Sequence, residues 1–558
     1  MTRPSDQKLR GGYYTPAPIA DFLASWAIRS STDEVLEPSC GDGSILTAAA
    51  RRLMGQGAPT ETLGQQLYGV ELDPQEAAKA AQRLRQLGLS LSSQNTIHVG
   101  DFFAHCQQRL FGEQVLTLVV QERRHFDAVI GNPPFIRYQH FPEEHRQIAF
   151  SLMQRAGLHP NRLTNAWLPF LVVGSLLLKE EGRLAMVIPA ELFQVNYAAE
   201  VRRFLSDYFS RVTLVTFQQL VFADIQQEVV LLLAERNHHP NSGIRAIELD
   251  GIEDLATLTL AELDAAALKP MDHSTEKWTQ YFLDSEEIHL LREMRAHPGV
   301  TAADQVLDVD VGIVTGRNAF FVLSEEEVKQ HGLEPYLERM VSRSGHLAGA
   351  IFDAADWQAN VAAQLPAFLF TPNDAPLEDL PVPLQQYIAL GEAKKYHKGY
   401  KCRIRKRWYV APSVWAPDAF MLRQVHAYPK LVLNTAQAVC TDTIHRVRFR
   451  DGANGEAVTA AYLNALTFAF AEVTGRSYGG GVLTFEPSEA ERLPLPLVNA
   501  ERLDLTHFDQ LLRADDVETA LDITDQVLLQ EGLGLRDAQV EMLRGIWVKL
   551  RDRRINRK

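Results

Sequence analysis

Apolar and polar residues along the first 245 positions follow a pattern that predicts short buried strands separated by helices. Strands alternating with helical stretches are typical of a mostly parallel sheet with helices on both faces. The predicted strands are residues 34–36, 66–71, 96–99, 126–130, 182–189, 212–217 and 228–233. The pattern therefore predicts an α/β, doubly wound domain over residues 1–245.

The rest of the chain shows different patterns. Residues 246–300 are acidic and helix-like, which predicts a helical connector. Residues 301–498 mix strand-like and helical stretches and predict a mixed α+β region, in which 310–323 is expected to form two strands around a glycine-rich turn. Residues 499–558 predict a helical segment whose basic end, 549–558, is expected to be a frayed and solvated tail.

Polar residues follow four consecutive predicted strands. Glu37 opens a glycine loop after the first strand, Glu71 ends the second, Asp101 follows the third and Asn132 follows the fourth. The carboxyl ends of parallel strands form the ligand-binding edge of open α/β sheets. Each residue alone has an ordinary alternative, a helix N-cap or a solvated strand end. Four in succession predict a binding site for a nucleoside-like ligand.

The loop Asn132-Pro133-Pro134-Phe135 predicts a chemical function. Both prolines fix their own φ and lack a backbone donor, so the loop is rigid and presents bare carbonyl oxygens. The Asn132 amide and these oxygens can accept hydrogen bonds at one point, while Phe135 provides a flat wall. An amino group on a planar ring fits such an acceptor site.

The composition limits which classes of protein the chain can belong to. The 558 residues are 46% hydrophobic and 23% charged, an ordinary globular mix. The four scattered cysteines predict neither a zinc site nor a disulfide framework, so no metal is expected. The sequence shows no opening signal peptide and no apolar run long enough to span a bilayer. This predicts a cytoplasmic protein that does not insert into a membrane.

A basic run stands out in a chain whose formal net charge is −14. Residues 394–407 carry eight Lys or Arg and no acid, interleaved with aromatic residues. A solvated face is the ordinary interpretation of charge runs, but this mixture favours a surface that follows DNA phosphates. Tyr478, followed by three glycines, indicates a second DNA-facing segment or a flexible loop.

Several motifs together resemble one family, the gamma-class N6-adenine DNA methyltransferases of the TaqI type. The matching segments, in family order, are Tyr14-Thr15-Pro16, residues 36–41, 69–71 and 100–102, the loop 132–135, and the helix expected within 165–182. The resemblance covers the first 245 residues well, and residues 310–323 and 476–487 resemble parts of the family's recognition domain. Phe135 departs from the family, where many relatives have tyrosine.

The resemblance implies a class I S-adenosylmethionine-dependent methyltransferase domain at 1–245 and a target-recognition DNA-binding domain at 301–498. The implied cofactor contacts are Thr15, Pro16, Glu37, Pro38, Ser39, Cys40, Gly41, Glu71, Leu72, Asp101, Phe102, Asn132 and Phe170. The implied catalytic residues are Asn132, Pro133, Pro134, Phe135 and Phe222, the last stacking on the target base opposite Phe135. The expected DNA contacts are Arg317, Lys398, Lys401, Arg403, Arg405, Lys406, Arg407 and Tyr478.

The implied function is site-specific methyl transfer from S-adenosylmethionine to the N6 amine of a flipped adenine in double-stranded DNA. A restriction-modification or related defence system in a bacterium or phage is the expected setting, with cognate restriction proteins as partners. Cytosine N4, RNA and protein glutamine remain alternative substrates, as does a catalytically silent DNA-binding protein. Glu327-Val328-Lys329 superficially suggests a nuclease, but Ser324 and Glu327 predict a capping box, so no second catalytic centre is expected.

Overall fold

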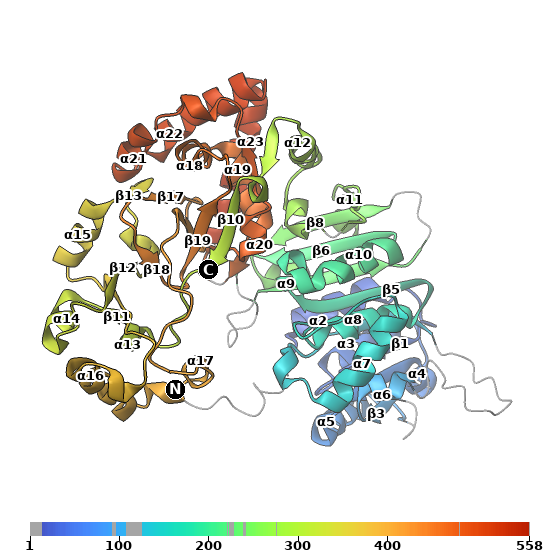
Figure 1. Ribbon diagram of the computed structural model, residues 1–558. Coiled ribbons are helices and arrows are strands. Elements are labelled where there is room, and N and C mark those ends of the chain that lie inside the picture. The colour runs from blue at the N-terminus through green and yellow to red at the C-terminus, as the bar shows by residue number, and fades with distance from the viewer. Residues whose placement is uncertain are drawn as a thin grey trace. The chain divides into compact units, whose positions relative to one another are not determined.

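The computed structural model describes residues 14–91, 96–107, 125–219, 221, 228–237, 242–274, 276–478 and 480–556. The chain divides into two compact units, an N-terminal unit that extends to Asp284 and a C-terminal unit from Ser285 to Asn556 (Figure 1).

The N-terminal unit is built on an eight-stranded sheet with the order β3-β2-β1-β4-β5-β7-β6-β8. Neighbouring strands run parallel except around β7, which is antiparallel to both β5 and β6. The strands are β1 (Val35–Glu37), β2 (Leu67–Glu71), β3 (Ile97–Val99), β4 (Phe126–Gly131), β5 (Leu178–Pro189), β6 (Arg211–Phe217), β7 (Val229–Glu235) and β8 (Gly243–Leu249). The predicted doubly wound, mostly parallel sheet is confirmed.

Helices cover this sheet, and their sequences explain their positions. Its helices are α2 (Ala17–Ala27), α3 (Ser44–Gly55), α4 (Thr60–Gln66), α5 (Pro74–Gln86), α6 (Phe102–His105), α7 (Glu143–Arg155), α8 (Trp167–Leu176), α9 (Glu191–Gln194), α10 (Ala199–Tyr208) and α11 (Leu260–Ala265). Asp73 caps α5 by accepting from the Gln75 N–H, with Pro74 as the first helical residue. Helix α8 is apolar all round and buried from Trp167 to Ser175, as expected of a core helix.

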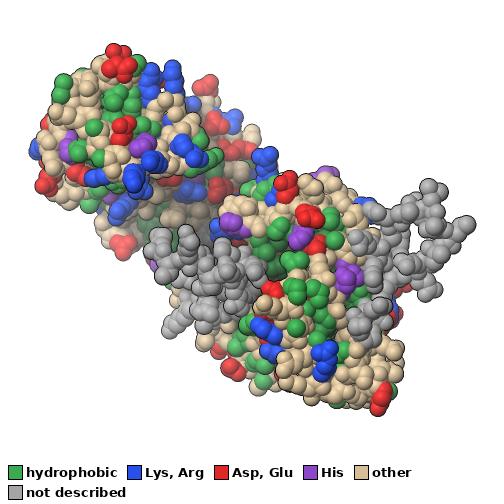
Figure 2. Space-filling view, turned by 90° about the horizontal axis from the view of Figure 1, so that it is seen from below, with side chains coloured by type: hydrophobic (Ala, Val, Ile, Leu, Met, Phe, Trp, Pro, Cys, Tyr) green, Lys and Arg blue, Asp and Glu red, His purple; other side chains and the backbone are tan. Residues whose placement is uncertain are grey.

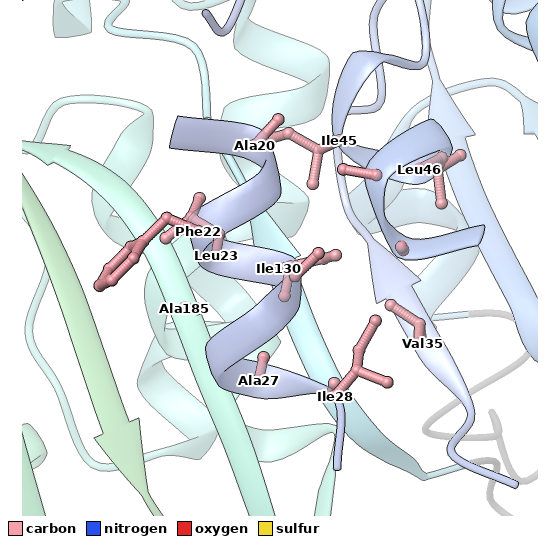
Figure 3. Packing of buried hydrophobic residues seen from close by; sticks show 14 of the residues in the cluster. Ala20, Phe22, Leu23, Ala27, Ile28, Val35, Ile45, Leu46, Ile130 and Ala185 are labelled. Carbon is pink, nitrogen blue, oxygen red and sulfur yellow. The ribbon is translucent and has the colours of Figure 1, made fainter. Parts of the chain in front are cut away.

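The core beneath the binding edge lies between α2, α3 and the central strands. Figure 3 shows Leu23 and Ala27 of α2 beside Ile130 of β4, with Ile45 of α3 and Val35 of β1 nearby. All five side chains are buried. This packing fixes where β1 and β4 end, and therefore where the loops after them begin.

The segment expected to be a connector is shared between the two units. Residues 246–284 belong to the N-terminal unit, where β8 pairs with β6. Residues 285–300 belong to the C-terminal unit and include α12 (Ser285–Ala296). The functional assignment of the domains at 1–245 and 301–498 remains a prediction.

The C-terminal unit has mixed α+β structure with several small sheets. Its sheets have the orders β10-β19-β15-β17-β13, β11-β14-β12-β18, β16-β21-β20 and β22-β9. The strands are β9 (Val300–Ala302), β10 (Leu307–Val311), β11 (Val322–Leu323), β12 (Leu337–Val341), β13 (Ile351–Phe352), β14 (Phe368–Phe370), β15 (Ala419–Leu422), β16 (Gln424–Val425), β17 (Leu431–Asn434), β18 (Val439–Cys440), β19 (Ile444–Phe449), β20 (Arg476–Tyr478), β21 (Val482–Thr484) and β22 (Pro494–Pro496). Its helices after α12 are α13 (Asn318–Phe321), α14 (Glu325–His331), α15 (Ala354–Ala362), α16 (Val382–Ala393), α17 (Tyr400–Arg403), α18 (Gly455–Ala461), α19 (Ala465–Thr474), α20 (Pro487–Ala490), α21 (Leu505–Arg513), α22 (Val517–Thr524) and α23 (Asp537–Ile555).

Two expectations for this unit were wrong and one was confirmed. Strands β10 and β11 do not pair around a turn, because β10 pairs with β19 and β11 with β14, and α13 lies between them. The basic C-terminus is not a frayed tail: α23 extends to Ile555, and Arg554 is buried in an ion pair with Glu472. The predicted capping box of Ser324 and Glu327 is present at α14.

No single helix among the described residues is long and apolar enough to cross a membrane. The short apolar helices α18 and α19 reach that length only as a pair bent by 75°.

Candidate active site and nucleic-acid interface

The end of β1 carries a buried carboxyl group. Glu37 is 2% exposed, and its Oε2 accepts a hydrogen bond from the Leu46 N–H of α3 at 3.0 Å. Burial raises the pKa of Glu37 well above its ordinary value, and the nearby carboxyl groups of Asp42 and Glu71 add to the rise. Glu37 therefore links β1 to the first turn of α3 at the base of the glycine loop.

The glycine loop turns tightly before α3. Gly43 has φ +80°, and a Cβ there would lie 2.7 Å from the Cα of Ala80 in α5. Gly41 has φ +50°, and a Cβ there would meet no atom within 4 Å, so this side of the loop is open. Gly43 serves packing, while Gly41 leaves room for a ligand beside the backbone.

Glu71 at the end of β2 braces this loop. Its Oε2 accepts from the Gly41 N–H and its Oε1 from the Asp73 N–H, both at 2.8 Å. Burial raises the pKa of Glu71, and the two backbone hydrogen bonds counteract part of that rise. Each carboxylate oxygen can accept a further hydrogen bond, so bracing the loop and holding a ligand are compatible.

Asp101, after β3, caps the short helix α6. It accepts from the Ala104 N–H at 2.9 Å and lies 3.4 Å from Nδ1 of His145. Burial raises the pKa of Asp101, whereas His145 opposes the rise. The rings of Phe102 and Phe170 stack on each other with centroids 5.3 Å apart, and both are buried. Two residues predicted independently are thus brought together.

Asn132 follows β4 at the same edge of the sheet. Its Nδ2 donates to Oγ1 of Thr15 at 3.2 Å, and Ser39 Oγ donates to the Asn132 carbonyl oxygen at 3.4 Å. A Cβ on Gly131 would lie 3.4 Å from Cδ of Pro38, so the ends of β1 and β4 pack closely. The two segments predicted on both sides of the site, at residues 15 and 132, are therefore in direct contact.

The other predicted residues differ in their surroundings. Pro133 is buried, Pro134 and Phe135 are half-buried, and Phe135 packs against the core of the N-terminal unit. Cys40 is buried, which raises the pKa of its thiol. Of the remaining predicted residues, Pro16 is the N-cap of α2, Pro38 is buried after β1 and Leu72 is 54% exposed to solvent. Phe222 lies outside the described residues.

Two features of the site were not predicted from the sequence. Asp42 accepts from the Ser44 N–H at 3.1 Å and pairs with Arg83 of α5. Asn165 accepts from the Tyr138 N–H at 3.3 Å and donates to the Tyr197 hydroxyl at 2.8 Å, which holds the loop after Phe135. The acid in Gly41-Asp42-Gly43-Ser44 was visible in the sequence and could have indicated the role of Asp42. The partners of Asn165 are too distant in the chain for a local sequence pattern to indicate them.

A cavity of about 510 Å³ lies beside the glycine loop, between α2, α3 and α5. Thr15 and Asp42 line it together with residues of these helices. Its other lining residues are Tyr14, Ala17, Ala20, Asp21, Ser44, Thr47, Arg51, Lys79 and Arg83.

The basic run lies in the C-terminal unit around the 3₁₀ helix η9 (Tyr396–Lys398) and α17. Its cations divide into two groups. Arg405 donates to the Val314 carbonyl oxygen at 2.7 Å and Arg407 pairs with Asp374, so these two brace the segment. Six cations are exposed: Lys394, Lys395, Lys398, Lys401, Arg403 and Lys406.

Arg317 lies beside this run. Its guanidinium is 4.6 Å from the ring centroid of Tyr396. A Cβ on Gly316 would lie 2.8 Å from the Lys401 Cβ, so the turn before α13 rests against α17. Two segments about 80 residues apart, both predicted to face DNA, therefore adjoin. Tyr478 belongs to β20, and its side chain lies outside the described residues.

Comparisons with known proteins agree with this arrangement. The N-6 DNA Methylase family model matches residues 3–310, and the model for the C-terminal domain of the type II methyltransferase M.Eco57I matches residues 275–529. The type II methyltransferase M.XamI of Xanthomonas campestris pv. amaranthicola is 24% identical over 87% of this chain and 85% of its own length. The type II methyltransferase M.AccI of Acinetobacter calcoaceticus is 20% identical over 88% of this chain and 87% of its own length.

Among solved structures, the type IIL restriction-modification enzyme MmeI in complex with DNA matches with a TM-score of 0.57. It is 10% identical, and the match covers 96% of this chain and 75% of that one, which is a likeness of fold. The family model spans more than half of the chain, including the glycine loop and the Asn132 loop. The chain therefore belongs to the N-6 DNA methylase family and is a DNA methyltransferase.

Proposed function

We propose that the protein transfers the methyl group of S-adenosylmethionine to the N6 amine of an adenine flipped out of double-stranded DNA, at a specific sequence within a restriction-modification system. The observation that carries the proposal is the position of Asn132, which follows β4 at the edge where the carboxyl groups of Glu37 and Glu71 also lie and contacts Thr15. The class I methyltransferase fold and the family imply use of this cofactor.

The described residues fit the cofactor. Glu37, Glu71 and Asp101 all have raised pKa values, chiefly through burial, so a cation bound nearby would stabilise their charged forms. S-adenosylmethionine carries a sulfonium and an ammonium group, and when bound it supplies an activated methyl group. The open side of Gly41 leaves room for such a ligand. We expect Glu71 to accept hydrogen bonds from ribose hydroxyls and Asp101 from the adenine amine of the cofactor.

Asn132 and Pro133 would act on the target amine. The lone pair of an exocyclic amine is delocalised into its ring, which makes the nitrogen a poor nucleophile. Thr15 accepts from Nδ2 of Asn132, and in this proposal Oδ1 of the same amide would accept from one amine hydrogen. The Pro133 carbonyl oxygen would accept from the other. Both hydrogen bonds would favour a pyramidal nitrogen whose lone pair could attack the methyl carbon as its bond to sulfur breaks, with one amine proton released afterwards. This is an effect of positioning and electrostatics.

The target base must leave the duplex, because its amine is inaccessible in the helix. Phe135 would stack on the extruded base, an interaction worth ~1–3 kcal/mol by analogy with single-strand binding. Phe222 is proposed for the opposite face. Asn165, which holds the loop after Phe135 through Tyr138, would keep that wall in position.

The test of this function is Asn132→Ala, compared with the wild-type protein. We expect the variant to bind S-adenosylmethionine and DNA but to lose methyl transfer by at least a hundredfold, as is usual when a group that acts in the transition state is removed. Tritiated methyl incorporation and binding isotherms measure the two properties separately. Normal transfer by the variant would exclude this mechanism.

Sequencing DNA from a host that expresses the wild-type protein would identify the modified base and its context. Methylated adenine is the expected product. Methylated cytosine would move the proposal to the N4 amine, which the same acceptors can hold. DNA without any modification, together with failure to bind S-adenosylmethionine, would instead indicate a silent DNA-binding protein.

A further inference from the structure

Two large apolar side chains are exposed at the end of the basic run. Tyr400 is 65% exposed and Ile404 is 60% exposed. Tyr400 begins α17 and Ile404 is its C-terminal capping residue, which still has helical backbone angles. Residues four apart on a helical turn lie on the same side. Tyr400 and Ile404 therefore form one apolar projection, which we call the α17 wedge.

Positive charge surrounds the α17 wedge. Lys398, Lys401, Arg403 and Lys406 are all exposed, and residues 394–407 contain no acid. Figure 2 shows Lys and Arg side chains on one face of the C-terminal unit, together with hydrophobic, His and some Asp or Glu side chains. A protein partner would need a much larger apolar area than two side chains. Charge complementarity instead favours a polyanion that can also accept an apolar group.

The α17 wedge stands on a supported segment. Cys402, between the two wedge residues, is buried, and its Sγ would lie 3.2 Å from a Cβ on Gly316. Arg405 is anchored to the Val314 carbonyl oxygen. The exposed side chains are thus held outward by buried neighbours, as is required of a group that must be pushed into a base stack.

We propose that Tyr400 and Ile404 insert between base pairs of double-stranded DNA while the four surrounding cations contact the flanking phosphates. Apolar side chains that enter a base step unstack it and bend the duplex, and the cost of unstacking is offset by the contacts that the bend permits. The inference rests on the proposed function in that it takes double-stranded DNA as the partner, and it assigns the bending step to the α17 wedge.

The test compares Tyr400→Ala/Ile404→Ala with Val382→Ala. Val382 is 62% exposed on α16 of the same unit and lies outside the basic run, so it is a matched control. The probe is a duplex selected from random-sequence DNA by its binding to the wild-type protein, labelled at both ends for energy transfer. Bend angle, affinity and the salt dependence of affinity are measured for each variant.

We expect the double variant to lose most of the bend and roughly tenfold in affinity, the loss expected for removing stacked side chains. The slope of affinity against salt should stay unchanged because the cations remain. Val382→Ala should match the wild type. If the double variant bends and binds DNA as the wild type does, the proposal that the α17 wedge inserts into DNA is wrong. A wild-type protein that bends DNA but transfers no methyl group would refute the proposed function alone.

Discussion

At the scale of single residues, the site is an edge where buried and half-buried acids lie close together. Glu37 and Glu71 both have pKa values raised by burial, and each is further raised by neighbouring carboxyl groups. The cation Arg83 pairs with Asp42. Such an edge favours a cationic ligand, because binding a cation relieves the repulsion between the carboxylates.

This electrostatic arrangement predicts that cofactor affinity depends on pH. A raised pKa keeps Glu71 protonated to a higher pH than an ordinary glutamate, whereas a cationic ligand prefers the carboxylate. The affinity for S-adenosylmethionine should therefore rise with pH through a range above the ordinary glutamate value of 4.5 and then level off. Isothermal titration at a series of pH values, from the ordinary glutamate pKa up to about pH 8, measures this dependence.

The control is Glu71→Gln, which cannot ionise and keeps one acceptor oxygen for the two backbone N–H groups that Glu71 binds. Its affinity should be lower at neutral pH and its pH dependence flatter than that of the wild type. If both proteins gave the same flat profile, the carboxylate of Glu71 would have no part in holding the cofactor.

At the scale of elements, local sequence patterns predicted the positions of the strands better than they predicted how the strands pair. Seven of the eight described strands of the N-terminal unit, β1 to β7, were located as short apolar runs, most of which end at or just before glycine, proline or an acid. Strand β8 was missed, because most of it lies in the segment expected to be a helical connector. Strand β10 was also recognisable, but its partner β19 begins more than 130 residues later. The two strands expected to pair at residues 310–323 do not pair, because local residues do not encode partners so far away in the chain.

The same limit explains which side-chain contacts the sequence did not show. Arg405 was grouped with exposed cations because the run contains no acid, but its partner is the backbone of Val314, about 90 residues earlier. Phe102 and Phe170 were both placed near the cofactor from motifs, and their stacking on each other was not visible in either motif. Sequence patterns therefore predicted that the candidate residues follow neighbouring strands at one edge of the sheet, but not the contacts that orient their side chains.

The turn from β1 into α3 offers a prediction at this scale. Gly43→Ala would place a Cβ 2.7 Å from the Cα of Ala80 and force α3 and α5 apart. We expect it to lower the free energy of unfolding by ~1–3 kcal/mol beyond the backbone strain of a positive φ, the usual cost of overpacking, and to weaken cofactor binding. Urea unfolding and titration with S-adenosylmethionine provide the two measurements.

Gly57→Ala is the matched control, because Gly57 has φ +95° but a Cβ there meets no atom within 4 Å. It carries the strain without the collision. Equal destabilisation by the two substitutions would show that contact between the loop and α5 contributes nothing.

At the scale of the whole molecule, the two units have separate cores, and the last helix completes the second. Helix α23 was expected to end in a solvated basic tail because Arg551, Arg553 and Arg554 follow one another closely. Arg554 is instead paired with Glu472 of α19, 82 residues earlier, with both side chains 3% exposed. A buried ion pair that closes a unit makes the stability of that unit depend on both partners.

Arg554→Met should therefore destabilise the C-terminal unit by ~3–5 kcal/mol, since it leaves the Glu472 carboxyl buried without its cation. Burial already raises the pKa of Glu472 despite the arginine. Replacing both partners, as Arg554→Met/Glu472→Leu, should recover much of the loss because no uncompensated charge remains. Scanning calorimetry with and without S-adenosylmethionine distinguishes the two units, because the cofactor should raise the melting temperature of the N-terminal unit. In the Arg554→Met variant we expect the melting temperature of the other transition to fall while that of the cofactor-sensitive transition stays unchanged. A double variant as unstable as the single one, or a fall of both transitions together, would contradict this account.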